Sequence, residues 1–501
     1  MLYTGLVSLN DNLNVQPQLA SSYDVSPDLL KWTFHLRPAL KFSDGTPLTA
    51  YDVAYSIDRA LQPTTHSAHC MTYLGLIKYA DQLHAGSLPS LINQSLLVPD
   101  DNTLVIQLST PAPYFLSALA YPCSYVVEKH LIDPYGGQKF TTRVAEGGSG
   151  PFRVAQYIPG RQLDLLPNPV YSGPQPQLKK VIFHFYQDII ASYEAYQAGQ
   201  LDTTTVPPLY NLQAQYNREY RSTPQLTTHY YTMNYLVKPF DNIHIRHAFA
   251  MALDKNLIVR AVWHDAFTPT CHILPKGMTG YNPDLLCDPG TNGDTQSDKS
   301  WTDKARTLLQ QGIHEEGWST VAQIPPITFT YATTSPYMYN EAIFAQQLWQ
   351  TILGIHVTLH PVSASALQSA ISAATNNPRG LQFWAANWSA DYPDARDLMA
   401  FQFADGAPYN NMNYGQNSSA SAPQQQAIQN QLTIADSTSD PLARVEAYHT
   451  AEQQLLNDVA WLPIYQVRIN FMLKPYVVGW HANATSLSPP NDWSNIYITA
   501  H

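Results

Sequence analysis

The spacing of apolar residues changes repeatedly along the chain between the two-residue period of a strand and the wider period of a helix. Residues 31–37 and 103–108 alternate apolar and polar side chains, which predicts half-buried strands. Thr49, with Asp52 three residues later, is typical of a helix start, and the apolar residues that follow share one helix face. The two patterns alternate irregularly and without an internal repeat, which favours α/β and α+β domains over a barrel or a repeat array.

Length and charge limit the class of protein. A chain of 501 residues has room for two to four domains at roughly 100–200 residues each. Its net charge is −11 and only 13% of its residues are charged. Such a chain lacks the basic surface that neutralises phosphates, so we expect no nucleic-acid partner. The longest apolar stretch, 114–127, is shorter than the ~18 residues of a membrane span.

Two local compositions give further expectations. Residues 410–431 are rich in Asn, Gln and Ser, which predicts an exposed segment. The four cysteines form no CxxC motif, and one pair, Cys271 and Cys287, is close in sequence. Their even number fits two disulfides in an oxidising compartment, and it also fits four buried free thiols.

Motifs for phosphate loops, dinucleotide turns and nucleophile elbows are missing from the sequence. The 17 histidines are scattered, and His244 and His247 have no third ligand at a recognisable spacing. We therefore expect neither a metal nor a cofactor.

Acidic and aromatic residues gather in one short segment. Trp384, Trp388, Asp391 and Tyr392 place rings beside a carboxylate, directly after a strand-like run. A slot lined by rings with one anionic group suits a ligand that carries an ammonium group. The segment also fits a solvated turn around Pro393, and a glycoside hydrolase would use Asp391 with Asp394 as its pair of carboxylates.

A series of short segments stands in a characteristic order along the chain: 2–7, 32–37, 41–53, 148–152, 168–171, 198–202, 239–248, 388–394, 451–456 and 461–465. Together these segments resemble one family, the extracytoplasmic solute-binding proteins (family 5) of ABC importers, of the oligopeptide- and dipeptide-binding type.

The resemblance implies an α/β protein with a two-lobed, periplasmic-binding-protein-like fold (type II) and an extra subdomain. Lobe I would combine 1–8, 147–236 and 467–501, the extra subdomain would be 9–146, and lobe II would span 237–466.

The function that the resemblance implies is that of a substrate-binding component, not an enzyme, which captures oligopeptides in an interlobe cleft. It would deliver them to membrane permease subunits and act as a monomer. An oligosaccharide or a nickel chelate is the alternative ligand. The residues implied to bind the ligand are Asp391, Trp388, Tyr392, Asn387, Tyr465 and Asn234, with Asp391 on the α-ammonium group and Trp388 and Tyr465 lining the cleft.

The resemblance also implies an extracytoplasmic location, periplasmic or at the cell surface with the transporter. In this oxidising compartment we expect disulfides between Cys271 and Cys287 and between Cys70 and Cys123. The residues from Met1 onward show no secretory signal. We expect the natural product to extend upstream, with a signal, a lipid-anchoring cysteine and a first strand.

Overall fold

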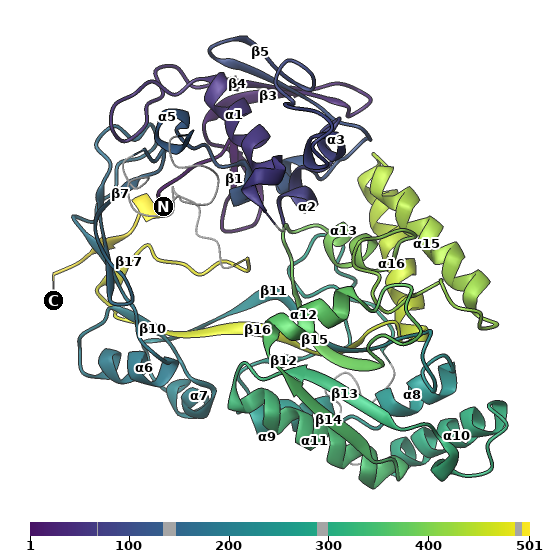
Figure 1. The fold of residues 1–501 in the computed structure, drawn as a ribbon. Helices are drawn as coiled ribbons and strands as arrows, with labels where there is room; N and C mark the ends of the chain where they lie inside the picture. Colours follow the sequence, from purple (N-terminus) through teal and green to yellow (C-terminus); the bar gives the residue numbers. More distant parts are fainter. Residues whose placement is uncertain (68, 134–146, 288–298, 486–492, 501) are drawn as a thin grey trace. The chain divides into compact units, whose positions relative to one another are not determined.

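The computed structural model describes residues 1–500 except 68, 134–146, 288–298 and 486–492. It contains two compact units, Met1–Thr205 with Phe471–His501, and Val206–Asn470 (Figure 1). The finer division into two lobes and an extra subdomain stays a prediction; it differs from these units at 206–236 and 467–470, which lie in the second unit. Within the described residues, no helix combines the length and hydrophobicity that a membrane span requires.

The first unit is built from small antiparallel sheets. The largest has four strands in the order β3-β4-β6-β5. The predicted alternation appears in β4, where Trp32, Phe34 and Leu36 are buried. The predicted helix start is also confirmed, because the Asp52 carboxylate accepts the backbone N–H of Thr49 at 2.8 Å. The strands of this sheet are β3 (Ala20–Val25), β4 (Lys31–Leu36), β5 (Leu96–Asp100) and β6 (Thr103–Gln107).

The remaining strands of this unit form a three-stranded sheet, β7-β8-β9, and the pairs β1-β2 and β17-β18, while β10 pairs with the end of β16 (Leu462–Leu473). Their bounds are β1 (Val7–Leu9), β2 (Val15–Pro17), β7 (Phe152–Ile158), β8 (Gln162–Pro167), β9 (Val181–His184), β10 (Thr203–Thr205), β17 (Val477–Val478) and β18 (Tyr497–Ile498). The helices are α1 (Ala50–Leu61), α2 (Cys70–Leu74), α3 (Ala80–His84), α4 (Phe115–Leu119), α5 (Lys129–Ile132) and α6 (Ile189–Gln197). The predicted Cys70–Cys123 disulfide is confirmed, with a Cα–Cα distance of 5.5 Å.

The second unit has one mixed sheet in the order β16-β11-β15-β13-β14, with β12 on β16. Helices α8 to α11 pack on this sheet around a core that includes Phe329, Trp349 and Phe383 (Figure 1). The strands are β11 (Tyr220–Met233), β12 (Thr268–Pro269), β13 (Ile327–Ala332), β14 (Val357–Val362), β15 (Phe383–Ser389) and β16 (Leu462–Leu473). The helices are α7 (Pro208–Ala214), α8 (Ile243–Met251), α9 (Lys255–Trp263), α10 (Lys299–Glu315), α11 (Pro336–Leu353), α12 (Ala364–Ser372), α13 (Ala395–Leu398), α14 (Ala400–Phe403), α15 (Ala422–Ser437) and α16 (Pro441–Asn457).

The prediction that 410–431 is exposed is wrong. Many of its amide side chains are buried and replace the backbone hydrogen bonds that turns leave open. Asn413 donates through Nδ2 to the Asn234 side chain at 2.9 Å and to the Ala374 carbonyl at 3.0 Å. Gln429 donates to the Phe403 carbonyl at 2.9 Å. An amide-rich segment can therefore be interior when its amides bond the backbone.

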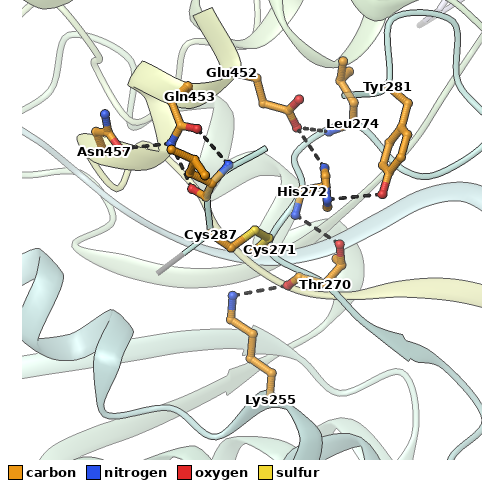
Figure 2. Close-up of a disulfide and its surroundings, with 11 residues drawn as sticks. Lys255, Thr270, Cys271, His272, Leu274, Tyr281, Cys287, Glu452, Gln453 and Asn457 are labelled. Atoms are coloured by element: carbon orange, nitrogen blue, oxygen red, sulfur yellow. Dashed lines mark hydrogen bonds and ion pairs between the residues drawn. A yellow bond between two sulfur atoms is a disulfide. The ribbon is translucent and has the colours of Figure 1, made fainter. Parts of the chain in front are cut away.

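The second predicted disulfide, Cys271–Cys287, is confirmed as well, with a Cα–Cα distance of 6.1 Å. Figure 2 shows that the loop it closes is also held by α16. Gln453 accepts the Leu286 N–H and donates to the Leu286 carbonyl, both at 3.0 Å. Glu452 accepts the Leu274 N–H at 2.9 Å. Disulfide and side chains together fix this loop on the second unit.

The partly buried His272 of this loop lies close to the buried Glu452 of α16. Nδ1 of His272 lies 4.0 Å from Oε1 of Glu452 (Figure 2). Burial raises the pKa of Glu452 to about 8. Burial, with a smaller effect of Lys255, lowers the pKa of His272 to about 4. Both groups are therefore neutral near pH 7.

The raised pKa of Glu452 predicts a loss of stability at alkaline pH. The folded protein holds this proton more tightly than the unfolded chain, whose carboxyl has the ordinary pKa of 4.5. The stabilisation is complete below pH 4.5 and is lost as the pH rises through about 8. As the pH rises from 4.5 to about 8, the free energy of unfolding of Glu452→Gln should therefore increase relative to that of the wild type by about 1.4 kcal/mol per pH unit.

Urea unfolding of both proteins at pH 5 to 8.5 measures this difference. His272 titrates in both, so its effect cancels in the comparison. Parallel pH curves for the two proteins would contradict the assignment of a buried, protonated Glu452.

Candidate functional site

The end of β15 and the turn after it bring the acidic and aromatic residues together. β15 pairs with β11, with Trp388 opposite Thr228. Beyond the strand, the Ala390 N–H donates to the Leu226 carbonyl at 2.7 Å, which keeps the chain beside β11 for one more residue. The turn then carries Asp391 and leads into α13. Trp388 and Asp391 are both partly buried.

Asp397 on α13 connects the end of β15 and the turn through hydrogen bonds. One of its oxygens, Oδ2, accepts the indole N–H of Trp388 at 2.8 Å and the backbone N–H of Asp391 at 3.1 Å. The side chain is fully buried. Burial and then the Asp391 carboxylate raise the pKa of Asp397 well above its usual range. The sequence singled out Asp391 but gave Asp397 no role, although a tryptophan beside a turn needs an acceptor for its N–H.

Asp394 has a structural role. Its two oxygens accept hydrogen bonds from the Arg444 guanidinium at 2.6 and 2.7 Å. Oδ1 also accepts a hydrogen bond from the Arg396 backbone N–H at 3.0 Å, at the start of α13. The Asp394 carboxylate raises the pKa of Arg444, although burial acts against it. A carboxylate held with this geometry is not placed for acid–base work, so the structure gives no support to a hydrolase using Asp391 and Asp394.

The aromatic residues divide into two groups. Trp388 packs edge-on against Tyr409, with ring centroids 4.7 Å apart. Tyr392, by contrast, is 1% exposed, and its hydroxyl accepts a hydrogen bond from Arg396 at 3.0 Å. Trp388 can therefore offer part of its ring to a ligand, whereas Tyr392 supports the turn from inside.

Of the other three predicted site residues, Asn387 directly precedes Trp388 on β15, whereas Tyr465 and Asn234 lie elsewhere in the second unit. The side chain of Asn387 is exposed, and its Oδ1 lies 2.5 Å from Nδ1 of His229. Tyr465 is 2% exposed, stacks on the His229 ring at 4.5 Å and donates to Glu341 at 3.1 Å. Asn234 is fully buried in the amide cluster with Asn413. The protein itself occupies the polar atoms of Tyr465 and Asn234.

Among the described residues, two groups place three possible metal ligands within 4.8 Å of one another. In Cys271, His272 and Cys287, the disulfide uses both sulfurs. In Asp44, Glu128 and His130, Nδ1 of His130 lies 2.9 Å from the Glu128 carboxylate. The first set therefore offers no thiolate to a metal, and in the second set the histidine already contacts a carboxylate.

Comparisons with known proteins agree with this fold. The family model described as Bacterial extracellular solute-binding proteins, family 5 Middle, matches residues 14–410. The periplasmic oligopeptide-binding protein OppA of Salmonella typhimurium is 27% identical, over 100% of this chain and 88% of OppA. The probable deoxycholate-binding periplasmic protein YgiS of Escherichia coli is 26% identical with the same coverage.

A solved structure of the murein tripeptide-binding protein MppA, in its unliganded open form, is 25% identical and superposes with a TM-score of 0.77, covering 100% of this chain and 92% of that chain. The fold is thus that of the two-domain periplasmic binding proteins, as predicted. The chain belongs to the bacterial extracellular solute-binding proteins of family 5, which confirms the resemblance found in the sequence.

The Asp394–Arg444 pair predicts a large effect on stability. Both side chains are about nine-tenths buried. Arg444→Met leaves a buried carboxylate without its partner and should lower the free energy of unfolding by about 3–5 kcal/mol. Arg306→Met is the matched control, because Arg306 pairs with Asp303 on the surface and its loss should cost about 0–1 kcal/mol. Equal losses in urea unfolding would show that the buried pair contributes no more than a surface pair.

Proposed function

We propose that the protein is the substrate-binding component of an ABC importer, which captures peptides outside the cytoplasm and delivers them to membrane permease subunits. Membership of family 5 supports this proposal, as do the names of two relatives, oligopeptide-binding OppA and murein tripeptide-binding MppA. The observation that carries it is the partly buried Asp391, whose backbone N–H shares one oxygen of Asp397 with the indole N–H of Trp388.

The chemistry of this site suits the free amino terminus of a peptide. In the proposed complex the α-ammonium group donates to Asp391, and Trp388 covers it with an apolar, electron-rich ring. Asn387, which is exposed at the end of the same strand, offers an amide to the peptide backbone. Tyr392, Tyr465 and Asn234 act in this proposal by holding the surrounding structure, since the protein already engages their polar atoms.

An anionic ligand fits this arrangement poorly. The relative YgiS is named as a probable deoxycholate-binding protein, and deoxycholate carries a carboxylate. At Asp391 an anion would meet a like charge, and the chain as a whole has a net charge of −11. Sugars and nickel chelates lack the ammonium group for which the carboxylate is suited. The proposal therefore commits to peptides with a free amino terminus and to a binding protein without enzymatic activity.

The test measures the binding of alanine peptides of three to five residues by thermal shift and by calorimetry. Wild-type protein should bind at least one of them, and the N-acetylated peptide should bind far more weakly. Asp391→Asn should weaken binding by about 100- to 1000-fold, because a buried charge pair loses one partner.

Asp405→Asn is the control, since Asp405 is an exposed acid just beyond α14. It should bind like the wild type. Binding of deoxycholate, maltotriose or a nickel chelate in place of every peptide would refute the proposal, and equal affinity for free and acetylated peptides would refute the role of Asp391.

A further inference from the structure

Asp397 has one oxygen whose hydrogen-bonding capacity the described structure does not use. While Oδ2 accepts hydrogen bonds from Trp388 and Asp391, Oδ1 is buried and has no hydrogen-bond partner among the described residues. An ionised carboxylate that is completely buried pays a large desolvation cost unless all its acceptors are satisfied. The half-satisfied carboxyl indicates that Asp397 carries a proton in this structure, or that another group supplies positive charge.

The described groups around Asp397 belong to the preceding turn, α13 and β15. The Asp391 carboxylate on the preceding turn disfavours a second negative charge, whereas Arg396, the next residue toward the start of α13, favours it. The Arg396 guanidinium is, however, held at 2.8 Å by Asp436 of α15 and at 3.0 Å by the Tyr392 hydroxyl. From β15 comes only the neutral indole of Trp388. The Asp391 carboxylate thus opposes ionisation of Asp397, and Asp436 shares the Arg396 charge that would favour it.

We propose that Asp397 is the positioning residue of the site and that ligand capture is linked to its ionisation, so that binding of a cationic group at Asp391 expels the proton from Asp397 to solvent. This inference rests on the proposed function, because it takes the peptide ammonium group as the cation. The ammonium charge replaces the proton in balancing the two carboxylates. The two hydrogen bonds through Oδ2 meanwhile hold the Trp388 ring and the Asp391 backbone in place.

The consequence is a pH-dependent affinity. Below the point at which free Asp397 ionises, each bound peptide must release a proton, so the affinity falls as the pH falls. The peptide amino group remains protonated below about pH 7, since its ordinary pKa is ~7.7–8.0. A window from pH 5 to 7 therefore reports on the protein.

Two variants separate positioning from ionisation. Asp397→Asn can still accept the two N–H groups through its amide oxygen, and its NH₂ stands where the protonated carboxyl carries its hydrogen. It keeps the geometry but cannot ionise. Asp397→Ala loses both acceptors. Because Asp397→Asn is nearly isosteric, it keeps the test valid even where the alanine variant folds poorly.

Calorimetry with the alanine peptide of three to five residues that the wild type binds most tightly provides the test, in buffers of different ionisation enthalpy. For the wild type we expect an association constant that falls by up to about tenfold per pH unit from pH 7 to 5, with up to about one proton released per peptide. For Asp397→Asn, the association constant should change by less than about twofold per pH unit, and binding should release no proton. Asp397→Ala should bind more weakly at every pH.

The outcomes distinguish this inference from the proposed function. If the wild type binds peptide and depends on Asp391, but Asp397→Asn keeps the wild-type slope and proton release, the inference alone is wrong. It is also wrong if Asp397→Ala binds as tightly as the wild type. If the wild type binds none of the peptides, the proposed function and this inference both fail.

Discussion

The carboxylate of Asp397 joins the end of β15 to the start of α13, and the geometry of the candidate site depends on it. Through one oxygen it fixes the Trp388 indole at 2.8 Å and the Asp391 backbone at 3.1 Å. Without this acceptor, two N–H groups in a partly buried turn would need other partners. The same atom therefore determines where the Trp388 ring and the Asp391 backbone lie relative to each other.

Other buried charges support this turn from behind. Arg444 on α16 holds Asp394 through two hydrogen bonds, and Arg396 is held by Asp436 on α15. Both charged pairs are extensively buried. Such pairs fix one arrangement of the chain more than they add to net stability. The turn can then present the partly buried Asp391 without rearranging when a ligand arrives, which lowers the entropic cost of binding.

Much of this architecture could be predicted from the sequence. The alternation of residues 31–37 and the Thr49–Asp52 pair gave a strand and a helix start that the structure confirms, because both signals act over a few residues. The disulfide pairs followed from the oxidising compartment that the family resemblance implies. The cluster of Trp388 with Asp391 was visible because its members are neighbours in sequence.

The rest depends on contacts between residues that are far apart in sequence. Asn413 belongs to the interior because it meets Asn234, 179 residues away, and composition alone predicted an exposed segment. Tyr465 was expected to face a ligand, but its hydroxyl meets Glu341 in the core of the second unit. Asp397 lies six residues after Asp391, and only the turn shows that its oxygen receives the Asp391 N–H.

A crystal structure of the protein with a bound alanine peptide tests the central claim most directly. The measured quantity is the distance from the Asp391 carboxylate to the nitrogen of the peptide's free amino terminus. The account predicts a charge-assisted hydrogen bond of about 2.7–2.9 Å with the amino group beside the Trp388 ring. An amino terminus bound away from Asp391, with this carboxylate facing solvent in the complex, would contradict it.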